Sequence, residues 1–391
     1  MPTPVDHIRR YHHELISFRR DLHAHPELAF QETRTAERVA QQLTAWDIEV
    51  HRGIAGTGLV GVIPGQRTGK RAVGLRADMD CLPMHETAER EHRSRTAGRM
   101  HACGHDGHTT MLLGAARYLR ETRAFAGTAY LIFQPAEEHG GGGNVMVQEG
   151  LFERFPANEI YALHNWPGLP AGQIAVRAGP VLAATDEIRI EVRGRGGHAA
   201  MPHLTVDPVV VTAHIITALQ TIASRNVSPL DAIVVSLCSM ETSQLGAFNV
   251  IPDAVKLIGT VRTFRSETQD LAQQRIAEIA SGVAAGLGAS ATLQYIRGYP
   301  ATVNTAREAD FAAQVGERIF GKDNVVREFD PTMGGEDFAY MLQARPGAYV
   351  LLGQGGGPSG CYLHNPNYDF NDDVIPLGAG YLAALAETAL A

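Results

Sequence analysis

The sequence predicts an α/β protein in which a mostly parallel sheet flanked by helices is interrupted by an inserted, smaller α+β domain. A chain of 391 residues is too long for one ordinary core. In its first half, short apolar strands alternate with amphipathic helices, which is typical of parallel sheets covered on both faces. From about Thr185 the pattern becomes a strict alternation of polar and apolar residues, which indicates a sheet with one wet face.

The first half contains four apolar runs of strand length and four helical patterns. The strands are expected at residues 60–63, 72–75, 130–133 and 160–163, and the helices at residues 8–21, 33–43, 107–120 and 144–150. In a parallel sheet, ligands gather at the carboxyl ends of the strands. Asp78, Asp80, Glu137, Glu138 and His164 all follow or end such strands, so we expect them to lie close together.

The middle of the chain has the order strand, helix, two strands, helix, strand, which resembles the split βαβ (ferredoxin-like) pattern. These elements are expected at residues 187–193, 207–225, 233–240, 254–264, 267–287 and 291–296. We therefore predict an inserted domain at residues 185–297 and a discontinuous first domain at residues 1–184 and 298–391. The second part of the first domain includes an apolar strand at residues 348–352.

Composition excludes several classes of partner. The net charge of −8 is spread without runs, so nothing could neutralise a row of phosphates, and neither nucleic acid nor a membrane is expected as a partner. A small solute is the expected ligand. The amino terminus is charged rather than signal-like, and the four cysteines lie far apart. Both observations predict a cytoplasmic protein in a reducing compartment.

The densest group of chemically active residues is the segment from His101 to His108. Cys103 and His105 lie two apart beside glycine, so both side chains can face one point, with Asp106 or Thr109 expected to cap the following helix. Thiolate and imidazole favour a transition metal over Ca²⁺ or Mg²⁺. His101 and His108 are interpreted as hydrogen-bonded residues behind the ligands or as surface residues.

Two pairs of carboxylates follow apolar strands. Glu137 and Glu138 are neighbours, and on an extended chain they would point to opposite sides, so that one can ligate a metal while the other faces the cavity. The alternative is a solvated turn. Asp78 and Asp80 are placed to accept a hydrogen bond from a ligand imidazole, or else to cap the turn at Pro83.

His164 and His364 each precede a polar loop and complete the donor set. Cys103, His105, Glu138, His164 and His364 are five donors, more than one tetrahedral ion needs. Five donors fit two divalent ions, and a thiolate such as Cys103 can bridge them. Zn²⁺ or Mn²⁺ is expected, with Co²⁺ or Ni²⁺ also compatible with this ligand set.

Eight motifs distributed in order along nearly the whole chain resemble the M20 metallopeptidase family, within it the amidohydrolase branch of hippurate hydrolases and hydrolases of indole-acetyl amino acids. They are Arg76–Asp80, Met100–His108, Gln134–Glu138, Gly196–His203, Asn249–Asp253, Gly259–Phe264, Met333–Phe338 and Leu363–Asp372. Two positions depart from the family pattern, His139 after the paired glutamates and Met84-His85-Glu86, and neither touches an expected ligand.

The resemblance implies a role for each site residue. Cys103 would bridge the two ions, His105 and His164 would complete one, and Glu138 and His364 the other. Glu137 would be the general base. In the inserted lid domain, His198 would polarise the scissile carbonyl, from the same or a neighbouring subunit, and Asn249 and Arg262 would hold the substrate carboxylate. A carboxylate suits Arg262, because a guanidinium can grip it through two parallel hydrogen bonds.

The resemblance therefore implies metal-dependent hydrolysis of the amide bond of an N-acyl amino acid with an acetyl, benzoyl or indole-acetyl group. It also implies a homodimer or a tetramer built from dimers. Two alternatives remain: a dipeptidase or carboxypeptidase with the same two metals, and a catalytically silent metal-binding scaffold. The silent scaffold would require loss of the base or of a ligand, yet Glu137 and the five donors are all present.

Overall fold

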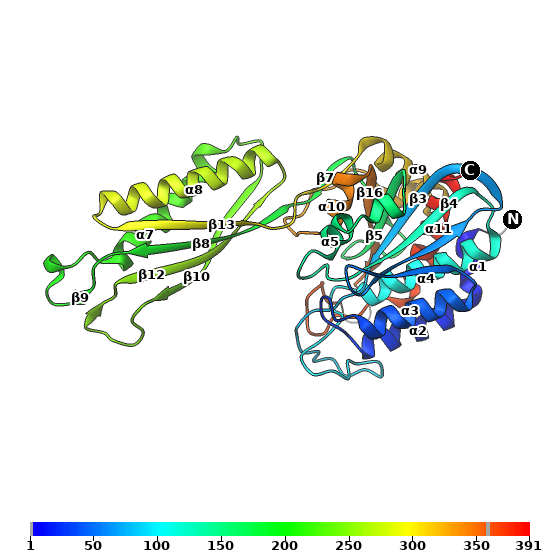
Figure 1. The fold of residues 1–391 in the computed structure, drawn as a ribbon, viewed down its shortest axis with the longest axis horizontal. Helices are drawn as coiled ribbons and strands as arrows, with labels where there is room; N and C mark the ends of the chain where they lie inside the picture. The colour runs from blue at the N-terminus through cyan, green and yellow to red at the C-terminus, as the bar shows by residue number, and fades with distance from the viewer. Residues whose placement is uncertain (1–2, 357–359) are drawn as a thin grey trace. The chain divides into compact units, whose positions relative to one another are not determined.

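A computed structural model describes residues 3–356 and 360–391, which form two compact units (Figure 1). Unit 1 comprises Met1–Val181, Thr302–Asp330 and Asp337–Ala391, and unit 2 comprises Leu182–Ala301 and Pro331–Glu336. Among the described residues, no helix is both long enough and apolar enough to cross a lipid bilayer.

Unit 1 is built on an eight-stranded sheet whose four central strands, β4, β3, β5 and β16, are parallel. Antiparallel strands extend the sheet at the β4 edge and beyond β16. The order across the sheet is β1 (Glu49–Ile54), β2 (Gly58–Pro64), β4 (Ala126–Gln134), β3 (Arg67–Asp78), β5 (Glu159–Pro167), β16 (Gly347–Gly355), β6 (Ile174–Ala175) and β15 (Val325–Val326). A separate ribbon pairs β7 (Gly179–Leu182) with β14 (Thr302–Asn304).

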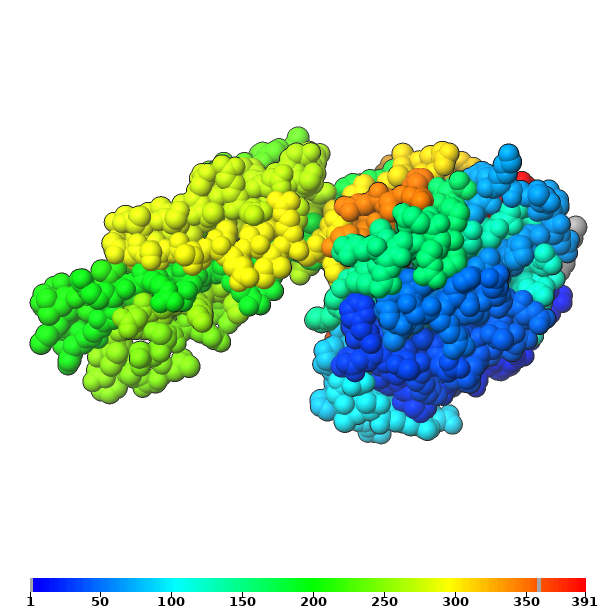
Figure 2. Space-filling model, in the orientation of Figure 1, coloured from blue at the N-terminus to red at the C-terminus, as the bar shows by residue number. Residues whose placement is uncertain are grey.

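Helices cover both faces of this sheet (Figure 1). One layer contains α4 and α11, which pack on each other and on β3 and β5, and the other contains α5 and α10, which pack on β4, β5 and β16. In Figure 2, the amino-terminal segment covers one side of unit 1. The helices of unit 1 are α1 (Pro4–Ile8), α2 (His12–Ala24), α3 (Thr33–Ala45), α4 (His105–Thr122), α5 (Gly142–Gln148), α6 (Leu151–Arg154), α9 (Ala306–Phe320), α10 (Phe338–Ala344) and α11 (Ile375–Ala389).

Close packing of α4 against α11 buries most residues of both helices. Nearly all of α4 is buried, including Met111, Leu112 and Leu113. A Cβ atom on Gly378 of α11 would lie 2.1 Å from the Met111 sulfur, so a larger residue there would require the Met111 side chain or the helix to shift. This contact fixes the helix whose first residue is His105.

Unit 2 has the predicted split βαβ order. Its four-stranded antiparallel sheet runs β10, β12, β8, β13, and α7 and α8 pack on it over one apolar core. β9 and β11 pair as a separate two-stranded ribbon. The ribbon lies next to the end of the sheet at which β12 begins. The elements are β8 (Ala184–Arg193), β9 (Gly197–His198), α7 (Pro208–Leu219), β10 (Ile233–Thr242), β11 (Val250–Ile251), β12 (Ala254–Thr263), α8 (Ser266–Gly286) and β13 (Ser290–Arg297).

The structure confirms the fold class and corrects two local predictions. The helix expected at residues 207–225 ends at Leu219 and continues only as a π-helical turn from Ile222. The predicted cap of α4 is wrong, since the helix has no side-chain cap. Asp106 accepts hydrogen bonds from His23 and Arg19, and the Thr109 hydroxyl donates to a backbone carbonyl of β3.

Candidate metal centre and active site

The carboxyl ends of the parallel strands bring the predicted donors together. Asp78 at the end of β3 is in register with Gln134 at the end of β4, and His164 of β5 is in register with Leu351 of β16. Because α4 begins at the same edge of the sheet, the segment before it joins them. The site is therefore built from the loops after β3 and β4, the start of α4 and the end of β5.

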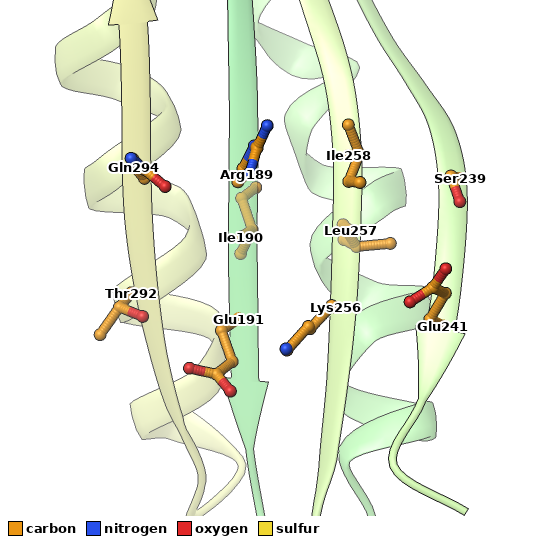
Figure 3. A pocket seen from close by; sticks show the side chains of 10 residues that line it. All are labelled: Arg189, Ile190, Glu191, Ser239, Glu241, Lys256, Leu257, Ile258, Thr292 and Gln294. Carbon is orange, nitrogen blue, oxygen red and sulfur yellow. The ribbon is translucent and has the colours of Figure 1, made fainter.

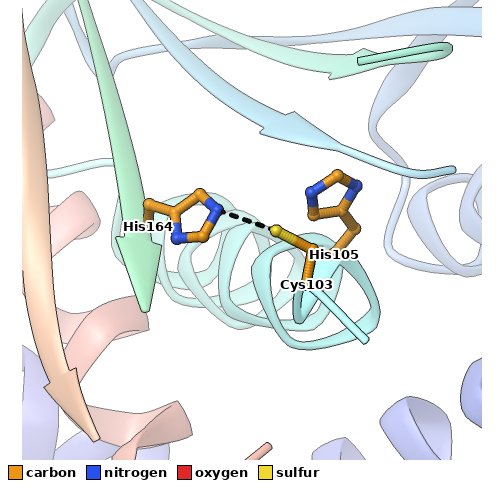
Figure 4. Close-up of side chains that lie close together, drawn as sticks. All are labelled: Cys103, His105 and His164. Atoms are coloured by element: carbon orange, nitrogen blue, oxygen red, sulfur yellow. Dashed lines mark hydrogen bonds between the residues drawn. The ribbon is translucent and has the colours of Figure 1, made fainter. Parts of the chain in front are cut away.

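Cys103 lies between two imidazoles (Figure 4). Its sulfur is 3.4 Å from His164 Nε2, and ligand atoms of Cys103, His105 and His164 all lie within 4.8 Å of one another. All three residues are buried. Gly104 adopts φ +98°, and a Cβ atom there would lie 2.4 Å from Asn165 Oδ1, so only glycine permits this close approach between Cys103 and His105.

A second group of donors also includes Cys103. Ligand atoms of Cys103, Glu138 and His364 lie within 4.8 Å of one another, with His364 Nε2 3.6 Å from Glu138 Oε1. The backbone N–H of His364 donates to Ala102 O at 2.8 Å, which ties the carboxyl-terminal loop to the segment that carries the thiol. His364 adopts φ +62°, a strained conformation that is typical of functional sites when a non-glycine residue holds it.

Glu137 and Glu138 do not point to opposite sides as we expected. Residues 137–140 form a turn after Ala136, which has φ +55°, so the chain is not extended there. One carboxylate oxygen of each glutamate lies 3.9 Å from His105 Nε2. Glu137 belongs to neither group of three that contains Cys103, and its carboxylate stands beside both.

Asp80 and Asp78 accept hydrogen bonds from different histidines, and only Asp80 accepts one from a predicted metal ligand. His105 Nδ1 donates to Asp80 Oδ1 at 3.2 Å, which leaves Nε2 free to face the other donors. Asp78 accepts instead from His108 Nδ1 at 2.6 Å, and its nearest approach to His105 Nε2 is 3.9 Å. Asp80 therefore fits the predicted support of a ligand imidazole, whereas Asp78 orients a histidine outside the two groups.

His101 and His108 are both buried, so the surface interpretation of these histidines is wrong. His108 Nε2 lies 2.6 Å from the side-chain oxygen of Asn165. Among the residues that the structure describes, neither ring nitrogen of His101 has a hydrogen-bond partner.

Burial and nearby carboxylates set the protonation of the donors. Burial raises the pKa of the Cys103 thiol well above its usual value, raises that of Glu138 to about 7, and lowers that of His164. Burial opposes protonation of His105 as well, but the charge of Asp78 and the hydrogen bond to Asp80 raise its pKa. Cys103 and Glu138 must therefore release protons before they can bind a cation.

The donor set fits two divalent cations. Two groups of three donors share one thiol, and sulfur, imidazole and carboxylate are ligands that transition metals accept. Within the described part of the chain, His105 Nε2 and Glu138 Oε1 are buried without a hydrogen-bond partner, which costs about 1–3 kcal/mol for each such group. A cation in each of the two groups would satisfy one of these atoms.

The predicted residues of unit 2 do not form one cluster. His198 of β9 and Asn249, which directly precedes β11, are both exposed, and the backbone N–H of Ala199 donates to Asn249 O. Arg262 is half-buried near the far end of β12, paired with Thr185 where the chain enters unit 2. The eight residue-to-residue steps from Ala254 to Arg262 separate the two ends of the sheet by about 26 Å.

A shallow hollow of about 420 Å³ lies on the open face of the sheet in unit 2 (Figure 3). Most side chains that line it are charged or polar, including Arg189, Glu191, Glu241 and Lys256. None of its ten residues is a predicted site residue, and it has no thiol or imidazole. We therefore do not assign the reaction to it.

Sequence reasoning missed a polar network behind the donors. Asn165 donates to Gln354 at 3.0 Å and to the Tyr368 hydroxyl at 2.7 Å, while its oxygen faces His108. Arg19, completely buried, donates to three aspartates, among them Asp106 of α4. The polar residues of the segment Asn365–Asp373 indicated that such a network could form, but their hydrogen-bond partners are distant in sequence and could not be identified.

Comparison with known proteins agrees with this geometry. Residues 74–388 match the model of Peptidase family M20/M25/M40. The chain belongs to this family. It is 39% identical over 373 residues to a hippurate hydrolase of Campylobacter jejuni, covering 95% of this chain and 96% of the relative. It is 36% identical over 380 residues to an N-acetylcysteine deacetylase of Bacillus subtilis, covering 97% of both.

A solved structure from the same family has the same fold. It is a Bacillus subtilis protein described as a dinuclear metal binding peptidase, with a TM-score of 0.84 and 32% sequence identity. The match covers 98% of this chain and 99% of that chain. This M20 chain thus shares its fold with a protein described as holding two metals, which is the number that the two donor groups can accommodate.

Proposed function

We propose that this chain hydrolyses the amide bond of N-acyl amino acids, with an acetyl, benzoyl or indole-acetyl group, and releases a carboxylic acid and a free amino acid. One observation carries the proposal: two groups of donors share Cys103, and the carboxylate of Glu137 stands beside both without belonging to either. The relatives named for hippurate and N-acetylcysteine, both N-acyl amino acids, support this substrate class.

In the proposal, residues 1–184 and 298–391 form the catalytic domain. His105 and His164 would hold one ion, Glu138 and His364 would hold the other, and Cys103 would contribute to both. Two ions held there would supply Lewis acidity for polarising an amide carbonyl and water. Zn²⁺ or Mn²⁺ suits these ligands, with Co²⁺ or Ni²⁺ as alternatives. A cytoplasmic location, where the thiol stays reduced, is part of the proposal.

Glu137 moves the proton. It takes a proton from the attacking water and gives it to the nitrogen of the leaving amine, as general acid–base catalysis requires. The buried position of Glu137 keeps bulk water from competing for that proton. His198 would donate a hydrogen bond to the carbonyl oxygen as negative charge develops on it.

Residues 185–297 form the lid and dimerisation domain in the proposal, and the chain acts as a homodimer or as a tetramer of dimers. Among the residues that the structure describes, no strand pairs with the outer edge of β10, and neither Ile233–Met240 nor the neighbouring α7 carries an Asp, Glu, Lys or Arg. Such an edge is a natural pairing surface. Antiparallel pairing of two β10 strands would place the Arg262 end of one sheet beside the β9–β11 end of its partner.

That pairing would bring Arg262 of one subunit to the same substrate as Asn249 and His198 of the partner subunit. Mixing the Arg262→Ala and His198→Ala variants tests it. Sites shared across the dimer predict recovered activity, because each heterodimer then contains one intact site. Sites complete within one subunit predict no recovery, since every site then carries one substitution.

The substrate class is tested with the metal-loaded protein on acetyl-, benzoyl- and indole-acetyl-amino acids beside dipeptides. We expect release of free amino acid that a chelator abolishes, with acylated substrates faster than dipeptides. Faster cleavage of dipeptides would favour the dipeptidase or carboxypeptidase alternative. No turnover with metals bound would favour the silent scaffold.

Glu137→Gln tests the base directly. The amide cannot take up the proton, so kcat should fall on the order of 10²-fold or more, while the protein still binds metal. Wild-type kcat in this variant would reject Glu137 as the base.

A further inference from the structure

The loop that carries Glu137 and Glu138 is held at three consecutive peptide groups by two buried carboxylates. The backbone N–H groups of Glu137 and Glu138 donate to the two oxygens of Asp80, each at 3.0 Å. The preceding N–H, that of Ala136, donates to Glu32 Oε1 at 2.8 Å. Glu32 lies 104 residues earlier in the chain and is completely buried.

Glu32 occupies the N-cap position of α3, but its side chain does not cap that helix. The first turn of α3 is capped instead by Glu27, which accepts from the backbone N–H groups of Arg34 and Thr35 at 3.0 and 2.8 Å. The carboxylate of Glu32 also accepts from the Thr57 hydroxyl at 2.6 Å and from the N–H of Phe30 at 3.1 Å. Glu32 is thus free of helix capping and serves the loop after β4.

Ala136 needs such an anchor because it adopts φ +55°, a conformation that costs a non-glycine residue energy unless its surroundings hold it. Phe30 covers the other end of the loop, since a Cβ atom on Gly140 would lie 2.6 Å from its ring. Burial raises the pKa of Glu32 to about 7. Even the protonated carboxyl retains a carbonyl oxygen that can accept the Ala136 N–H.

We propose that Glu32 is a positioning residue that fixes the Ala136 peptide and thereby aims the carboxylates of Glu137 and Glu138 into the site. The proposal rests on the role of Glu137 given above. Misplacement of a catalytic group by about 1 Å can cost on the order of 10²-fold in rate. Binding of substrate through groups elsewhere would be unaffected.

The test compares Glu32→Ala and Glu32→Gln with the matched control Glu27→Ala. We expect Glu32→Ala to lower kcat about 10–100-fold with KM unchanged, and Glu32→Gln to recover most of that loss. Gln keeps an oxygen for the Ala136 N–H, and the Thr57 hydroxyl can turn to accept from its amide. Glu27→Ala should lower Tm through the lost cap and leave kcat unchanged. If Glu32→Ala does not fold, Glu32→Met takes its place in the test. Methionine is close to glutamate in size but has no oxygen that can accept the Ala136 N–H.

Amide hydrogen exchange in the metal-free protein gives a readout independent of turnover. The Ala136 amide should exchange faster in Glu32→Ala than in the wild type or in Glu32→Gln. Wild-type kcat in Glu32→Ala, equal loss in Glu32→Gln, or unchanged exchange at Ala136 would overturn the proposal. If Glu137→Gln keeps its activity, the role of Glu137 as the base fails instead, and the exchange result still decides whether Glu32 anchors the loop.

Discussion

Asp80 offers the most quantitative prediction, because one carboxylate holds both a candidate ligand and the loop of the base. It accepts from His105 Nδ1 at 3.2 Å and from the backbone N–H groups of Glu137 and Glu138 at 3.0 Å. In Asp80→Asn one oxygen becomes an NH₂ group that faces a donor. At least one hydrogen bond to a charged acceptor is lost, which is worth about 1.5–3 kcal/mol.

At 1.36 kcal/mol for each factor of ten, that loss predicts a fall of about 10–150-fold in metal affinity, in kcat, or divided between them. Competition with a chelator measures the affinity, and steady-state kinetics at saturating metal measures kcat. Asp186→Asn is the control, since Asp186 is a buried carboxylate of unit 2 that accepts from Gln269 and Tyr295. Wild-type affinity together with wild-type kcat in Asp80→Asn would refute the reasoning.

Three further predictions follow from the site. His364→Ala should halve the amount of bound metal, because only Cys103 and Glu138 would remain in the second donor group. Elemental analysis that still finds two ions per chain would contradict this prediction. Burial raises the pKa of Glu138 to about 7, so its contribution to the stability of the metal-free protein is lost as pH rises through about 7. Added metal should therefore raise Tm more at about pH 8 than at about pH 6, and calorimetry showing the reverse would reject this. Gly104→Ala should weaken metal binding, because its Cβ atom would lie 2.4 Å from Asn165 Oδ1; an unchanged chelator titration would disprove it.

The sequence predicted what depends on local pattern and strand order. Asp78, Asp80, Glu138 and His164 lie in or directly after the carboxyl-terminal parts of apolar strands that are parallel in the structure, so the sequence alone predicts their convergence. His364 was expected at the site only because it would complete the set of five metal donors. Its contact with the site depends on a backbone hydrogen bond to Ala102, which no pattern in the sequence reveals.

Features that depend on pairing between distant segments were not predictable. Glu32 directly precedes the helix predicted at residues 33–43, and nothing in the sequence indicates that its side chain serves a loop 104 residues away. The turn after Ala136 brings both glutamates to His105, although an extended chain would have separated them. The separation of Asn249 from Arg262 follows from the register of β12, which the alternation of residues does not fix.

The central claim is that two ions share Cys103. Anomalous diffraction from crystals of the metal-loaded protein tests it most directly. We predict two peaks, one beside His105 and His164 and the other beside Glu138 and His364, with the Cys103 sulfur in contact with both. A single peak, or two peaks of which only one touches Cys103, would contradict the account.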